Sequence, residues 1–126
     1  MTDFALMDIA SIQAGLRAKD FTAREVAENA LERVNTVDQQ IHAFLETCPD
    51  LAFAAADRVD AAIAAGDLSR AGLLAGVPVA FKDNMNLIGT HTTCASRMLE
   101  NYVSPYTATC VARIIDQGGI PLGKLN

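Results

Sequence analysis

The sequence predicts an α/β fold built around a parallel pair of strands. Within an apolar run over residues 73–81, the continuous apolar stretch 77–81 is typical of a strand buried on both faces, as in parallel sheets. Several longer segments carry apolar residues at helical spacing. Near the end of the chain a helical segment is followed by a second short apolar run, at 120–122. This strand, helix, strand order implies parallel pairing through a right-handed crossover.

The composition is that of a globular protein, with 126 residues of which 51% are apolar and 6% aromatic. The chain carries 10 basic and 15 acidic residues, a formal net charge of −5. Its lysines and arginines do not cluster, so we do not expect direct binding to nucleic acid or to a membrane surface. We recognise no signal peptide and no spanning segment. Three widely spaced cysteines without a Cys-x-x-Cys pair argue against a disulfide framework or a zinc site, and we expect a cytoplasmic protein.

The first elements are predicted to be helical. Residues 4–18 keep a roughly helical apolar spacing and predict a short amphipathic helix. Thr22 opens a second helix, because Glu25 follows at the spacing of a capping box. Residues 41–45 alternate enough to predict a short strand, which would carry His42.

An alanine-rich helix is expected next. Pro49 suits its first position and Gly66 its C-terminal end. Because alanine makes a helix thin, we expect this one to pack closely against a neighbour.

The second half of the chain contains the predicted strands at 77–81 and 120–122. Between them, residues 83–106 lack sustained periodicity apart from a possible short helix at 96–100, and such a long irregular segment inside a compact domain is usually functional. Thr107 is expected to cap a last helix, which the pair Gly118–Gly119 would end.

Lys82 is the main candidate for chemistry, because it stands where the first of these strands emerges. An ammonium at such a place can lose hydration, which makes the neutral amine available as a base. The alternative is a charged strand end that only discourages edge-to-edge aggregation. Asp83 and Asn84, which follow it, fit a turn better than a role in substrate binding.

Other polar residues in the second half favour structural roles. Cys94 with His91 could suggest a thiol nucleophile, but a free cysteine in a loop is the better interpretation. Ser96 is expected to cap the short helix. Cys110 is expected to be a small core residue, and Lys124 a solvated strand end that is not a second base.

Four stretches together resemble the motifs of the amidase-signature family. The branch they resemble most is that of the A subunits of glutamyl-tRNA(Gln)/aspartyl-tRNA(Asn) amidotransferases. The resemblance is sharp from about residue 73 onward and looser before it. The matching stretches are Leu74–Asn84, Gly89–Tyr102, Pro105–Thr109 and Gly118–Lys124.

The resemblance implies the start of a large mixed sheet between layers of helices. We therefore divide the chain into a helical region with a short strand (1–72) and the start of an amidase core (73–126). It also implies Lys82 as the catalytic base of a Ser-cisSer-Lys mechanism that hydrolyses glutamine and supplies ammonia for transamidation of mischarged tRNA. Leu125 departs from the threonine more usual in the family.

Both family serines lie beyond the motif that ends at Asn126, so we expect the chain to be an N-terminal fragment that is inactive alone and self-associates. The partners implied are glutamine as substrate and the B and C subunits of the amidotransferase, with tRNA contacted mainly through one of them. No cofactor is expected in this chain, since ATP and Mg²⁺ would be held by a partner. A stand-alone amidase acting on another carboxamide, and a truncated non-catalytic interaction module, are the alternatives.

Overall fold

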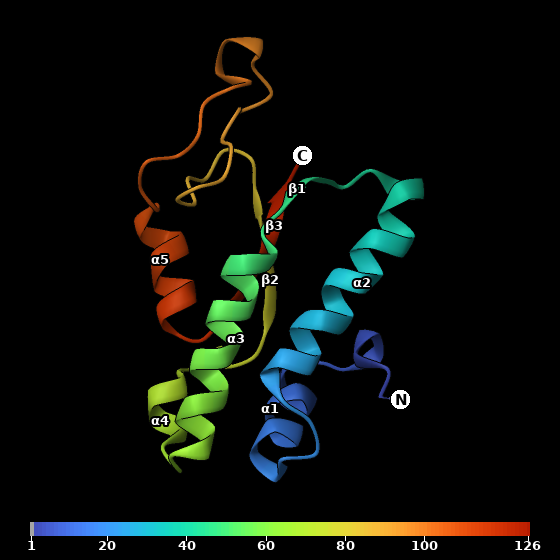
Figure 1. Ribbon diagram of the computed structural model, residues 1–126, viewed down its shortest axis with the longest axis vertical. Helices are drawn as coiled ribbons and strands as arrows, with labels where there is room; N and C mark the ends of the chain where they lie inside the picture. Colours follow the sequence, from blue (N-terminus) through green and yellow to red (C-terminus); the bar gives the residue numbers. More distant parts are fainter. Residues whose placement is uncertain (1) are drawn as a thin grey trace.

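The computed structural model describes residues 2–126. Figure 1 shows the strands lying between α2 and α5, with the irregular segment after β2 extending beyond the sheet. No helix in this range has the length and apolar character needed to cross a bilayer. The elements in chain order are η1 Phe4–Leu6, α1 Ile9–Ala18, α2 Ala23–Ile41, β1 Phe44–Thr47, α3 Pro49–Ala64, α4 Leu68–Ala71, β2 Pro78–Lys82, η2 Arg97–Leu99, α5 Thr109–Asp116 and β3 Ile120–Leu125.

The sheet has the strand order β1-β3-β2, with β3 in the middle. β2 pairs with β3 in parallel, which confirms the predicted α/β class, and β1 pairs with β3 antiparallel, so the sheet is mixed. The strand β1 from the region before residue 72 thus joins strands from the region after it. The domain boundary at residue 72 itself stays a prediction.

Gly123 lies where the register of the β2–β3 ladder shifts, between Val79 and Ala80 of β2. It pairs with Thr47 on one side and with Ala80 on the other. A Cβ atom at this position would come within 2.1 Å of the Glu46 carbonyl oxygen. Only glycine therefore lets β1 approach the middle strand this closely.

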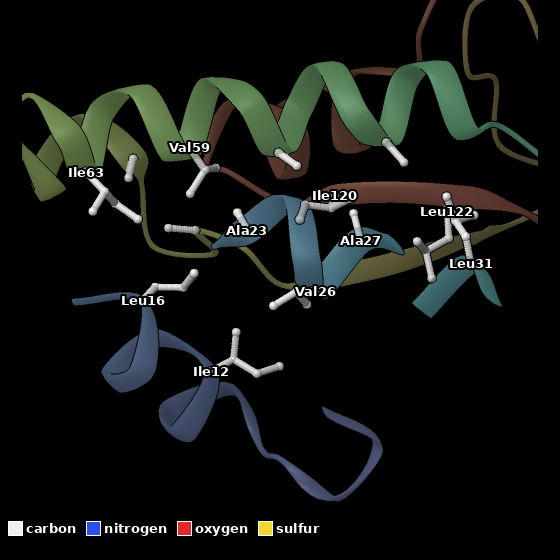
Figure 2. Packing of buried hydrophobic residues seen from close by; sticks show 14 residues of the cluster. Ile12, Leu16, Ala23, Val26, Ala27, Leu31, Val59, Ile63, Ile120 and Leu122 are labelled. Carbon is white, nitrogen blue, oxygen red and sulfur yellow. The ribbon is translucent and has the colours of Figure 1, made fainter. Parts of the chain in front are cut away.

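The main core lies between the helices α1, α2 and α3 and the strand β3, as Figure 2 shows. Small residues fill the contact between helices, and four alanines there are fully buried: Ala23, Ala27, Ala52 and Ala56. This confirms the expectation that the alanine-rich helix packs closely. A second, smaller cluster joins β2 to α5 through Phe81, Leu87 and Val111.

The N-terminus of α2 is fixed by two sets of acceptors. The predicted capping box is confirmed, since Thr22 Oγ1 accepts from the Glu25 amide at 3.1 Å and the Thr22 amide donates to Glu25 Oε2 at 2.7 Å. In addition, the Asp60 carboxylate of α3 accepts from the amides of Ala23 at 2.7 Å and Arg24 at 3.0 Å. These bonds satisfy N–H groups that have no partner within the helix.

The expectation of one helix over residues 4–18 is wrong in its first half. The short helix η1 and the helix α1 are separate, and each begins after an aspartate. The Asp3 carboxylate accepts from the Ala5 amide at 3.1 Å, and that of Asp8 accepts from the Ser11 amide at 2.8 Å. A second N-cap inside the apolar pattern starts a new helix there.

The predicted strand at 41–45 begins too early. Helix α2 continues to Ile41, and His42 is its C-cap with a left-handed φ of 57°, so His42 does not lie on a strand. The Asp38 carboxylate explains the exit, because it accepts from the amides of Ala43 at 2.8 Å and Phe44 at 3.1 Å. The strand therefore starts only at Phe44.

Three expectations for the second half are also wrong. Thr107 does not cap α5, whose N-cap is Ala108, because the Thr107 hydroxyl accepts from the Ile88 amide at 3.1 Å. Cys110 is exposed and is not a core residue. β2 is not buried on both faces, since Phe81 is its one buried residue, Pro78 to Ala80 are partly exposed and Lys82 is exposed. Gly118, with φ at 87°, does end α5 as predicted.

We predict that Thr22→Ala lowers the free energy of unfolding by about 1 kcal/mol, because it removes the acceptor of the capping box. Thr36→Ala is the matched control, since Thr36 is an exposed residue inside α2 whose hydroxyl bonds only to carbonyls of its own helix. Urea unfolding followed by circular dichroism measures both variants. Equal losses for the two variants would show that the cap contributes nothing particular.

Candidate functional site

Lys82 is the last residue of β2, as predicted, and its side chain is exposed. Its carbonyl oxygen accepts from the Met85 amide at 3.0 Å, which confirms the turn expected at Asp83 and Asn84. Within residues 2–126, Lys82 Nζ forms no ion pair or hydrogen bond with the protein. The dehydration that we expected for this ammonium is thus not supplied by the described residues.

Asp83 is buried directly behind this turn. Its amide donates to the Leu125 carbonyl at 2.8 Å, which extends the contact between the ends of β2 and β3. Its carboxylate accepts from the Thr93 amide at 3.1 Å and from the Thr93 hydroxyl. The residue after Lys82 is therefore held on both its backbone and its side chain.

Lys124 is fully buried, so the expectation of a solvated strand end is wrong. Its Nζ atom donates to the His91 carbonyl at 2.9 Å and to Thr92 Oγ1 at 3.0 Å, and it lies 3.6 Å from Asp83 Oδ1. The error arose because β3 continues to Leu125 and the segment after β2 covers its end. The apolar neighbours of Lys124 in the sequence, Leu122 and Leu125, were the available signal for a strand that continues past Leu122.

The segment after β2 contains two consecutive non-glycine residues in the left-handed region, Cys94 with φ at 50° and Ala95 with φ at 58°. Such residues cost on the order of 1–3 kcal/mol each and occur preferentially at functional sites. The Cys94 amide donates to the Asp83 carbonyl at 2.9 Å, so this strained turn lies against the residue after Lys82. Ser96 caps η2 as predicted, through a bond from the Met98 amide at 3.3 Å.

Cys94 and His91 do not form a nucleophile–base pair. Cys94 is exposed, and His91 instead faces Glu46 of β1, with Nδ1 at 3.2 Å from Oε1. The His91 amide also donates to Glu46 Oε2 at 2.8 Å. Glu46 thus ties β1 to the segment after β2, a contact that sequence reasoning missed.

Comparison with known proteins identifies the family. A family model described as "Amidase" matches residues 25–126. The chain belongs to the amidase family. The A subunit of the glutamyl-tRNA(Gln) amidotransferase of Gloeobacter violaceus is 46% identical over 96% of the chain and 24% of its own length. The protein of the same name from Chromohalobacter salexigens is 42% identical over 100% of the chain and 25% of its own length.

Solved structures agree with this assignment. Native peptide amidase from Stenotrophomonas maltophilia superposes with a TM-score of 0.88 at 30% identity, over 98% of this chain and 25% of that one. A protein of a vestigial complex related to the origins of an s-triazine catabolic enzyme gives a TM-score of 0.89 at 30% identity, over 95% of this chain and 26% of that one. The chain therefore spans about a quarter of the length of the relatives it matches. It has the fold of the N-terminal portion of such enzymes.

The three thiols should differ in reactivity. Burial, together with the charge of Glu46, raises the pKa of Cys48 to about 12, whereas Cys94 and Cys110 are exposed. We predict that iodoacetamide at pH 8.5 modifies two thiols of the folded chain and a third only in denaturant, because the thiolate is the nucleophile. Peptide mass mapping checks this, and rapid modification of Cys48 in the folded chain would contradict it.

The raised pKa of Cys48 makes the stability of the fold depend on pH. Since the pKa of Cys48 is raised on folding, its contribution to stability is complete below about pH 9 and is lost as the pH rises towards 12. Cys48→Ala should remove that part of the alkaline loss of stability.

Proposed function

We propose that this chain is the N-terminal part of one subunit of a glutamine-dependent amidotransferase, with Lys82 as its general base. The observation that carries the proposal is the contrast between the two lysines of the matched motifs. Lys124 is buried and its donors are used inside the protein, whereas Lys82 is exposed at the end of β2. Of these two lysines, only Lys82 is accessible to groups from outside the described residues.

The substrate class follows from the relatives. The A subunits of two glutamyl-tRNA(Gln) amidotransferases are 42% and 46% identical to nearly the whole chain, whereas the peptide amidase is 30% identical. The higher identity supports glutamine over a peptide amide as the substrate. It also supports B and C subunits as partners, with mischarged tRNA, ATP and Mg²⁺ engaged through them.

Lys82 would act at the beginning of the reaction. Its neutral amine would accept, through an intermediate serine, the proton of a nucleophilic serine that attacks the side-chain amide carbon of glutamine. The C–N bond breaks, ammonia leaves with a proton returned from Lys82, and water then releases glutamate from the acyl-enzyme. Entry of the serine-bearing segment beside Lys82 would also supply the dehydration that residues 2–126 do not.

The strained turn supports this placement. Cys94 and Ala95 lie beside Asp83, so a fixed and unfavourable backbone conformation adjoins the proposed base. A rigid surrounding is what a base needs in order to keep its geometry during proton transfer.

We predict that Lys82→Ala in the full-length protein, assembled with its partner subunits, lowers kcat for glutamine hydrolysis by at least about 1,000-fold. Lys19→Ala is the matched control, since Lys19 is an exposed lysine at the end of α1. Glutamate release measures both. Retained turnover in Lys82→Ala would place the base elsewhere, and preferential hydrolysis of a peptide amide would overturn the proposed substrate.

The 126-residue chain alone should release no glutamate and should not sediment as a monomer. It supplies one of three catalytic groups, and it exposes large apolar side chains, among them Leu6, Leu73 and Met98 at 85%, 82% and 94%. The outer sides of β1 and β2 are also unpaired within the described residues. Sedimentation velocity over a range of concentrations tests this, and a single monomer species at all of them would contradict it.

A further inference from the structure

Lys124 is the largest side chain that is completely buried in the described residues, and the mechanism above does not use it. An ammonium taken out of water is strongly destabilising unless charge and hydrogen-bond partners replace its hydration. The groups that contact the Lys124 ammonium therefore indicate which part of the structure its burial stabilises.

All three partners of Lys124 belong to the segment that follows β2. The ammonium donates to the His91 carbonyl and Thr92 Oγ1, at 2.9 and 3.0 Å, and it lies 3.6 Å from the Asp83 carboxylate. Lys124 is on β3, where it pairs with Phe81 of β2. The Lys124 ammonium on β3 thus holds the segment after β2 in place both at its beginning and at its middle.

The bonds continue outward from the ammonium through side chains. Thr92 Oγ1 lies 2.7 Å from Ser104 Oγ, Ser104 Oγ donates to Asn86 Oδ1 at 3.0 Å, and Asn86 Nδ2 donates to the Tyr106 hydroxyl at 2.8 Å. Among the described residues, no buried side-chain polar atom lacks a partner. A fully satisfied network of this kind is rigid.

We propose that Lys124 is a positioning residue for Lys82. Asp83 follows Lys82 directly, and its carboxylate is held between Lys124 and Thr93. The buried ammonium thereby fixes the turn that begins at Lys82 and the strained backbone at Cys94 beside it. The inference rests on the proposed function, in that Lys82 is taken as the base.

The opposing interpretation is a charge pair that only stabilises the fold. It predicts that loss of Lys124 weakens all elements together and leaves the turnover of the folded molecules unchanged. If Lys124 positions Lys82, loss of Lys124 should leave the fold intact and displace the Lys82 side chain. Displacement of a reacting group by about 1 Å can lower a rate by about 100-fold.

The test uses Lys124→Met in the full-length protein with its partner subunits, since methionine keeps the length of the side chain and removes the charge. We expect kcat for glutamine hydrolysis to fall by about 100-fold while KM changes by less than about 3-fold. Adding Asp83→Asn to Lys124→Met should recover at least about 10-fold, because it removes the uncompensated carboxylate. Lys19→Met is the control and should match the unmodified protein.

Hydrogen exchange on the same variants requires no substrate. In Lys124→Met, amide protection should be lost over residues 83–106 and kept over 23–41. The hydrogen-exchange measurement tests the role of Lys124 even if glutamine is not the substrate. Full activity of Lys82→Ala would show instead that the proposed function has failed. Unchanged protection over 83–106, or a kcat within about 3-fold of the unmodified protein, would overturn the role of Lys124.

Thr92→Val provides the second variant, because Lys124→Met can fail to fold. It keeps the volume and the charge pair, and removes the hydroxyl that joins the ammonium to Ser104. We expect kcat to fall by about 10-fold at unchanged KM. An unchanged kcat in a folded Thr92→Val protein would overturn the inference.

Discussion

The middle strand β3 forms hydrogen-bonded ladders with two strands of opposite direction, since β1 runs antiparallel and β2 parallel to it. Ile120 and Leu122 near its start contribute to the main core, and Lys124 near its end packs against the segment after β2. Without β3, the helices would lack the surface on which they pack, and β2 would have no hydrogen-bonded neighbour among the described residues. The geometry around Lys82 depends on the same strand, because the Asp83 amide bonds to Leu125.

Local signals in the sequence predicted most of the fold correctly. The capping box at Thr22, the proline at the start of α3, the glycine after α5 and the apolar run of β2 each specify an element through nearby residues, and each was found. The errors came where a distant or competing polar group decided the outcome. The Asp38 carboxylate accepts from the amides of Ala43 and Phe44, so β1 starts only at Phe44. The Thr107 hydroxyl accepts from the Ile88 amide and therefore does not cap α5.

The site could be predicted only in part, for a related reason. Lys82 and Lys124 look alike in the sequence, because each is a lysine near the end of a short apolar run. What separates them is tertiary: the segment after β2 folds over one lysine and leaves the other exposed. The family resemblance selected Lys82, but neither local pattern nor resemblance indicated that Lys124 would be buried with Asp83 and Thr92 around it.

The pairing of β1 with β3 joins an early part of the chain to its last residues. During synthesis on the ribosome, α1, α2 and α3 emerge well before Ile120 and Leu122, so the apolar faces of these helices stay exposed until β3 emerges. Contacts between such distant segments slow folding, and the waiting state is prone to aggregation. The nascent chain is therefore a candidate for protection by chaperones until β3 has emerged from the ribosome.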